Sequence, residues 1–376
     1  MEILYYSSQG PMTALLQLAL NRLGFNAGAE DGIFGERTLR AVKAFQGSRA
    51  LEQSGVVWPA TWEELLPFLY TQGVFSTIPY SSEVLKINLE GLKLQYPGAR
   101  SEIIGASVLG EPIHMVKVGN RSKKVMFNAS HHANEWITTP LLVKLLFDLL
   151  SAQARGGELY GVNIGELLEI VGLDCIMMVN PDGVDLVTGE VRKDSAIYNR
   201  ALGLNTPGTP FPDGWKANIK GVDLNLNYPA GWDRARELKY AAGYTSPGPR
   251  DYVGPYPLSE PETEAMVRQT EAGNYLLTVS LHTQGEVIFW TFEDIMPPRA
   301  REIGLAMERA SGYALDVPGE FSSYAGYKDW FLLNYNRPGY TPECGRGVNP
   351  LPIEQFDEIY AHVAPMLVAA MLEITR

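Results

Sequence analysis

Two histidines and a glutamate in this sequence have the types and spacing of a catalytic zinc site. His132 and Glu135 stand three residues apart, and His282 follows far downstream. Catalytic zinc commonly takes three ligands of this kind and keeps a fourth position open for water or substrate. His131 competes for the first ligand position, but side chains three residues apart across a tight turn converge more readily, which favours His132. We therefore predict one zinc ion per chain, held by His132, Glu135 and His282.

The elements around these residues are expected to bring them to one edge of a sheet. Residues 124–129 have the composition of a buried strand, and His132 and Glu135 follow on the turn after it. Residues 275–281 form a second β-rich run, which ends at His282. Sites in open α/β sheets form outside the carboxyl ends of strands. The helical H-E-x-x-H zinc motif is absent, so this site differs from that of the helical zinc proteases.

Composition narrows the classes of partner. The chain has 376 residues and a formal net charge of −12 at pH 7, so extensive contact with nucleic acid or an anionic membrane is not expected. Its two cysteines cannot make a disulfide framework. Neither a signal peptide nor an apolar run of membrane-spanning length is evident. We therefore expect a globular protein that stays in the compartment where it is made.

The first part of the chain is expected to be a separate module, residues 1–70, followed by a linker, residues 71–82. Apolar residues recur at helical spacing from Met12 to Leu23, and two further helices are predicted at 36–45 and 61–69. This module resembles the three-helix peptidoglycan-binding domain of wall hydrolases through these matching residues: Leu23-Gly24-Phe25, Asp31-Gly32-Ile33-Phe34-Gly35, Thr38, Ala41-Val42 and Phe45-Gln46.

Residues 83–376 are expected to form one larger domain in which strands and helices alternate. A helix is predicted from Glu83 to Tyr96 with Ser82 as its N-cap, and a strand hairpin is predicted within residues 101–118. Alternation of this kind predicts an α/β fold, with a mixed, twisted sheet covered by helices on both faces.

The motifs of the larger domain resemble those of the zinc carboxypeptidase family, with its carboxypeptidase A-like fold. They occur in the same order: His132-Ala133-Asn134-Glu135-Trp136, Asn180-Pro181-Asp182-Gly183, Gly221-Val222-Asp223-Leu224-Asn225, His282 and Thr341-Pro342-Glu343. The resemblance implies that Glu343 is the catalytic glutamate, which takes a proton from water and passes it to the leaving amine. It also implies that Asp223 hydrogen-bonds the first zinc histidine and fixes its tautomer.

A cation beside the developing oxyanion is a further part of the family's site. The family supplies an arginine just after a tryptophan, and Trp215-Lys216 occupies that place here. Lys216 is therefore our candidate, with Lys220 and Arg346 as rivals. Arg346 and Asn225 are also candidate substrate contacts.

The sequence departs from the family at residues that would contact the substrate. Exopeptidases of the family follow the motif asparagine with an arginine that grips the terminal carboxylate through two hydrogen bonds. Here Leu226 follows Asn225, so ordinary carboxypeptidase activity is not expected. In the family, the residue before an Asp-Trp pair lines the floor of the specificity pocket, and Lys328 has that position here. The resemblance thus implies a preference for a substrate side chain with a carboxylate. For the family's mobile tyrosine, ungapped counting gives Phe321, and Tyr324 is the nearest tyrosine.

A wall-binding module, a missing carboxylate clamp and a basic pocket floor together resemble one bacterial branch of the family. That branch hydrolyses the γ-D-glutamyl–meso-diaminopimelate bond of peptidoglycan stem peptides. We therefore expect a monomeric zinc metallopeptidase acting on peptidoglycan or muropeptides, located in the cytoplasm or forespore. Three alternatives remain: a zinc carboxypeptidase of relaxed specificity, a zinc deacylase or amidase, and a non-catalytic wall-binding protein.

Overall fold

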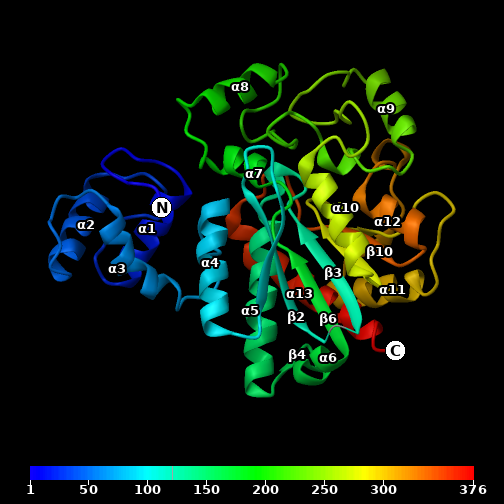
Figure 1. Ribbon diagram of the computed structural model, residues 1–376, viewed down its shortest axis with the longest axis horizontal. Helices are drawn as coiled ribbons and strands as arrows, with labels where there is room; N and C mark the ends of the chain where they lie inside the picture. The colour runs from blue at the N-terminus through cyan, green and yellow to red at the C-terminus, as the bar shows by residue number, and fades with distance from the viewer. Residues whose placement is uncertain (121) are drawn as a thin grey trace.

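A computed structural model of the protein describes residues 1–120 and 122–376. At its centre is an eight-stranded sheet with the order β1–β2–β6–β3–β7–β10–β8–β9 (Figure 1). The strands are β1 Arg100–Ala106, β2 Pro112–Gly119, β3 Lys123–Ala129, β6 Val171–Ile176, β7 Leu277–Leu281, β8 Val287–Phe289, β9 Ala314–Asp316 and β10 Gly339–Glu343. β6, β3, β7 and β10 run parallel to one another, whereas β1–β2, β2–β6 and β8–β10 are antiparallel. The carboxyl ends of β3, β7 and β10 therefore meet at one edge of the sheet.

Helices cover both faces of this sheet, as predicted. Successive side chains of a strand point to opposite faces, and in β3 Val125 and Phe127 enter one hydrophobic cluster while Met126 enters the other. The first cluster includes α5 (Thr138–Arg155), α11 (Ala300–Ser311) and α13 (Phe356–Glu373). The second includes α10 (Pro261–Gly273) and α12 (Tyr327–Tyr335). The remaining elements of this part are α4 Ser82–Gln95, β4 Glu158–Leu159, β5 Val162–Asn163, α6 Ile164–Ile170, α7 Pro181–Thr188, α8 Ala196–Leu204, α9 Trp232–Ala241 and the 3₁₀ turns η1 Ala133–Glu135, η2 Leu224–Leu226, η3 Glu320–Ser322 and η4 Ile353–Gln355.

One helical stretch is apolar enough to span a membrane by length and composition, contrary to the expectation from the sequence. It runs from Ala133 to Arg155, but 72% of its most apolar window is buried inside the protein. This burial is that of a core helix, and α5 packs against β3 and α13.

The N-terminal segment forms the three predicted helices, α1 (Pro11–Arg22), α2 (Glu36–Ser48) and α3 (Pro59–Leu69). They lie beside α4 in Figure 1, and both α1 and α3 contact α4. Every residue of α1 from Pro11 to Leu20 is buried, so this helix is covered on all sides. One hydrophobic cluster runs through the small helices and the sheet. The N-terminal helices are thus docked on the larger part of the protein.

The predicted linker, residues 71–82, is also packed. Phe75, Ile78 and Tyr80 are fully buried, and the Tyr80 hydroxyl donates to Asn88 Oδ1 at 2.6 Å. The predicted N-cap of α4 was wrong by one residue, because Ser81 caps the helix. Ser82 instead donates its hydroxyl to Asp185 Oδ2 at 2.6 Å, which ties the start of α4 to α7.

Candidate metal centre and active site

Three neighbouring strands deliver the predicted chemical groups to one place. His132 and Glu135 follow β3, with Glu135 in the 3₁₀ turn η1. His282 comes directly after β7, and Glu343 is the last residue of β10. His282 and Glu343 form a parallel β-bridge just beyond the regular pairing. Parallel strands that share one edge thus place residues from three distant parts of the chain side by side.

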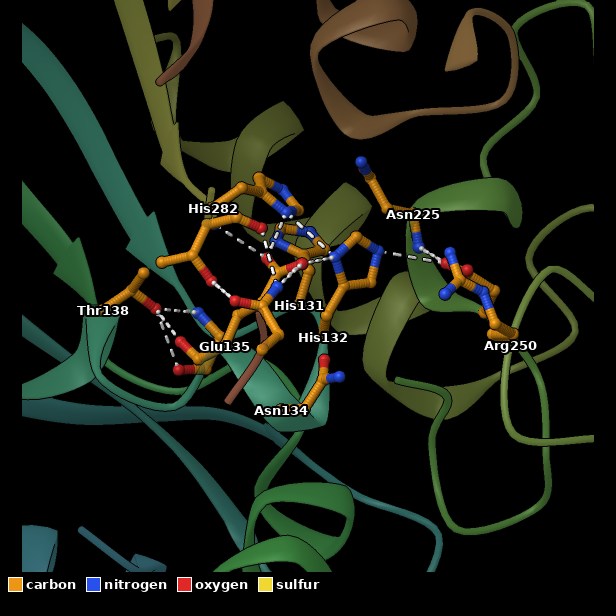
Figure 2. A network of polar contacts seen from close by, with 12 residues as sticks. His131, His132, Asn134, Glu135, Thr138, Asn225, Arg250 and His282 are labelled. Carbon is orange, nitrogen blue, oxygen red and sulfur yellow. Dashed lines mark hydrogen bonds and ion pairs between the residues drawn. The ribbon is translucent and has the colours of Figure 1, made fainter. Parts of the chain in front are cut away.

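The side chains of His132, Glu135 and His282 converge on a common point (Figure 2). His132 Nδ1 lies 2.9 Å from Glu135 Oε1, and His282 Nδ1 lies 2.9 Å from Glu135 Oε2. The two Nδ1 atoms are 3.0 Å apart. Ligands of a tetrahedral zinc with bonds of 2.0–2.1 Å would stand about 3.3 Å apart, so these donor atoms need to move apart only slightly to hold the ion. The buried nitrogen and oxygen donors therefore fit the predicted metal.

Asp223 holds the far side of the His132 ring. Its Oδ1 lies 3.1 Å from His132 Nε2, and it also accepts backbone N–H bonds from Asn225 and Asp251. Burial acts to raise the pKa of Asp223, but the charges of His132 and Lys216 outweigh it and hold this pKa well below its usual range. An ionised Asp223 accepts the Nε2 proton and leaves the Nδ1 lone pair of His132 free for a metal.

The rival histidine, His131, lies outside this donor group. It is fully buried, its Nε2 is 3.0 Å from the Tyr228 hydroxyl, and its ring stacks on that of His282 with centroids 5.7 Å apart. Burial lowers the pKa of His131 well below its ordinary value, so the ring is neutral. His131 therefore supports the site by packing.

A cavity of about 730 Å³ opens at this edge of the sheet. It contains Glu343 beside the donor group, and burial together with the charge of Glu135 raises the pKa of Glu343 to about 8. A cation held by the donor group would oppose that shift. No side-chain hydrogen bond to Glu343 is found within residues 1–120 and 122–376, so its carboxylate is available to water or substrate. Four cations also line the cavity: Lys216, Lys239, Arg250 and Lys328.

The structure separates the three candidates for the oxyanion cation. Lys216 lines the cavity, and its charge acts on both Glu135 and Glu343. Its Nζ makes no hydrogen bond or ion pair with any residue that the structure describes. Lys220, in contrast, pairs with Glu260 at 3.1 Å and does not line the cavity. Arg346 pairs with Glu286 and lines a different, smaller pocket, so its predicted contact with substrate is not supported by this placement.

The predicted substrate contacts Asn225 and Lys328 both line the cavity. Asn225 Oδ1 accepts from Tyr327 N at 2.9 Å, which fixes the side chain and leaves its amide nitrogen as a donor. Lys328 is only 6% exposed. Its Nζ bonds the Asp329 carboxylate and the carbonyl oxygen of Thr291. The lysine predicted at the pocket floor is thus one half of a buried ion pair, and both partners line the cavity.

The assignment of Tyr324 as a substrate contact stays a prediction. Tyr324 does not line the cavity; its ring packs edge-on against Phe292, with centroids 5.7 Å apart, and against Gly231. Phe321, three residues earlier, does line the cavity and lies over the Nζ of Lys239. The residue found by ungapped counting, Phe321, therefore lines the cavity, whereas the residue chosen because it is a tyrosine, Tyr324, does not.

Sequence reasoning missed the acid–base cluster at the His132 end of the cavity. Asp251 Oδ1 accepts from Lys239 at 2.6 Å, and its Oδ2 accepts from Arg250 Nε at 2.7 Å. No local motif marks these residues. Their loop reaches the site because Pro249 accepts backbone hydrogen bonds from Lys216 and Ala217.

Comparisons with known proteins agree with this fold and show the family. The sequence pattern of the zinc carboxypeptidase family matches residues 86–345, and that of a putative peptidoglycan binding domain matches residues 9–65. The chain therefore belongs to the zinc carboxypeptidase family and is a zinc metallopeptidase with an N-terminal peptidoglycan-binding domain. Both matches fall inside the predicted ranges 1–70 and 83–376, whose limits stay predictions.

The chain is also similar along most of its length to individual proteins. The chain is 41% identical over 292 residues to gamma-D-glutamyl-L-diamino acid endopeptidase 1 of Lysinibacillus sphaericus, covering 78% of this chain and 72% of that protein. It is 38% identical to the uncharacterized protein YqgT of Bacillus subtilis, covering 73% of each. The solved carboxypeptidase A of Helicoverpa armigera shares the fold, with a TM-score of 0.59 at 18% identity and 99% of each chain covered.

Proposed function

We propose that this protein hydrolyses the γ-D-glutamyl–meso-diaminopimelate bond of peptidoglycan stem peptides. The observation that carries the proposal is a metal-binding group and Glu343 in a cavity where Leu226 stands in place of a carboxylate clamp. Leu226 lines the cavity and is 7% exposed, so its apolar side chain offers a terminal carboxylate nothing to bond. The name of the Lysinibacillus sphaericus relative and the peptidoglycan-binding domain support the same substrate.

His132, Glu135 and His282 would hold the zinc ion of this site. The bound ion would polarise the scissile carbonyl and lower the pKa of water. Glu343 takes a proton from the attacking water and passes it to the leaving amine, since its carboxylate lies at the cavity with no side-chain hydrogen-bond partner among the described residues. Lys216, whose charge acts on Glu343 and Glu135 and whose Nζ has no ion pair among the described residues, stabilises the negative charge that develops on the carbonyl oxygen.

The pocket floor fits the end of a meso-diaminopimelate side chain. That end carries a carboxylate and an ammonium, and the floor carries the Lys328 ammonium beside the Asp329 carboxylate. Each charge of the ligand can then pair with its opposite on the floor, and the buried site keeps its overall neutrality. A lysine side chain brings only the ammonium, which pairs with Asp329 but leaves no carboxylate for Lys328.

Digestion of a defined peptide tests this function. The tripeptide L-Ala-γ-D-Glu-meso-diaminopimelate should give L-Ala-D-Glu and free diaminopimelate by mass spectrometry, and the purified enzyme should contain one zinc per chain. Efficient release of C-terminal residues from ordinary peptides, with the tripeptide left intact, would favour the carboxypeptidase of relaxed specificity. A zinc-containing protein that cuts only small acyl-amino acids would favour the deacylase. Wall binding with no hydrolysis would favour the non-catalytic alternative.

We also propose that the enzyme works as a monomer, which light scattering during size-exclusion chromatography would test.

A further inference from the structure

Arg250 carries a hydrogen-bonding edge that the protein itself leaves unused. Its Nε donates to Asp251 Oδ2 at 2.7 Å, which fixes the plane of the guanidinium. No hydrogen bond from Nη1 or Nη2 is found to any residue in the described parts of the chain. The side chain is 49% exposed and lines the same cavity as Glu343. A guanidinium held in this way presents two parallel N–H groups, the geometry that binds a carboxylate.

The position of Arg250 places that edge on one defined side of the metal-binding group. A chain of contacts leads from Arg250 to Asp251, from the Asp251 backbone N–H to Asp223, and from Asp223 to His132 Nε2. In Figure 2 the His132 ring accordingly lies between His282 and Arg250. The pair formed by Lys328 belongs to a different wall, where it bonds Thr291 after β8.

Arg250 shares this side of the cavity with a second unsatisfied cation. Lys216 makes no recorded ion pair in the described residues, and the charge of Arg250 is one of those acting on it. The charges of Asp223, Glu135 and Asp251 act on Lys216 more strongly than that of Arg250, so the repulsion between the two cations is already offset. What remains on this side is the free Nη edge of Arg250, which can bind a negatively charged group of the substrate.

We propose that Arg250 binds the free α-carboxylate of the D-glutamyl residue on the acyl side of the scissile bond. This inference rests on the proposed function, in which the γ-carboxyl of D-glutamate is the group in peptide linkage. The α-carboxylate then stays free, separated from the scissile carbonyl by a three-carbon spacer. Lys328 and Asp329 occupy the side that receives the leaving diaminopimelate, so Arg250 remains for the acyl side. Lys216 stabilises the oxyanion, and Arg250 binds the α-carboxylate. An ordinary α-peptide has no carboxylate at this distance from the scissile carbonyl.

A purely structural role for Arg250 makes a different prediction. If Arg250 only steadied Asp251 and, through it, Asp223, its loss would reduce turnover of every substrate by the same factor. If Arg250 binds the α-carboxylate, its loss matters only when that carboxylate is present. Stem peptides whose D-glutamate is α-amidated, that is D-isoglutamine, remove the charge while keeping the shape of the acyl group.

The test is a cycle of two substrates and two enzymes. We would measure kcat/KM of wild type and Arg250→Gln, both in the full-length zinc-loaded form, on the D-glutamate and D-isoglutamine forms of the tripeptide. Wild type should prefer the carboxylate form by about 10- to 100-fold, the value of hydrogen bonds to a charged group. Arg250→Gln should lose that factor on the carboxylate form and change little on the amidated form. Arg250→Lys should recover part of the loss, since it restores the charge without the fork.

The controls separate the possible failures. Arg236→Gln, which removes an exposed arginine paired with Asp233 outside the cavity, should leave both substrates unaffected. Equal losses on the two substrates in Arg250→Gln, or a wild type that cuts both equally well, would overturn the role of Arg250 and leave the proposed function standing. A wild type that cuts neither form would instead overturn the proposed function.

Discussion

Replacing Lys328 by methionine should destabilise the protein and weaken its preference for diaminopimelate. The side chains of Lys328 and Asp329 are 7% and 5% exposed, so this is a buried ion pair. Removal of one partner leaves the other charge uncompensated, which costs about 3–5 kcal/mol. Asp329 keeps a backbone hydrogen bond from Gly326 at 3.3 Å. We therefore expect the lower end, a loss of about 3 kcal/mol in the free energy of unfolding.

A second variant isolates the charge from the packing. Lys328→Met/Asp329→Asn removes both charges together, and neutral replacement of a buried pair is often without net cost. Its free energy of unfolding in urea at pH 7 should therefore lie well above that of the single variant. Arg192→Met breaks a fully exposed pair with Asp194 and serves as the matched control, which should behave like wild type.

The same variants report on specificity. Wild type should cut stems with meso-diaminopimelate faster than stems with lysine at the third position, by about tenfold or more in kcat/KM. Both variants should narrow that ratio, mainly by losing activity on the diaminopimelate stem. A single variant no less stable than the double one, or a wild type indifferent to the two stems, would refute the ion-pair reasoning.

Three further predictions concern the metal, the proton transfer and the N-terminal helices. His282→Ala should lose zinc under mild chelation, as measured by atomic absorption. His131→Ala should keep zinc and lose about 1–3 kcal/mol of stability through lost packing. Zinc retained in His282→Ala would contradict the ligand set. Glu343→Gln should keep zinc and substrate binding but lose turnover, because the amide cannot accept the proton of water; activity near wild type would require another base. Deletion of residues 1–70 should weaken wall binding. It should also lower the Tm and promote aggregation, because it exposes the face of α4 that α1 and α3 cover. An unchanged Tm in differential scanning calorimetry would contradict the shared core.

The sequence by itself determined the metal-binding group and the outline of the fold. The zinc candidates could be found because their spacing is local: His132 and Glu135 lie on one short turn, and His282 follows a strand-like run. The two-residue period of β3 and the alternation of strands with helices likewise depend on neighbours in sequence. The apolar pattern of α1 also indicated its docking, which was not predicted: the helix is apolar nearly all round, which is typical of a helix buried on every side.

Only the tertiary structure decided which charged side chains are free and which are already paired. Lys216, Lys220 and Arg346 all carry a positive charge. Lys220 and Arg346 pair with acids, whereas Lys216 has no ion pair among the residues that the structure describes. The charge of Lys328 is met by Asp329. Arg250 enters the site on a loop held by long-range backbone bonds. Ion pairing depends on distances of a few ångströms between segments far apart in the chain, and such distances are set by the packing of the whole fold, which spacing along the sequence does not record.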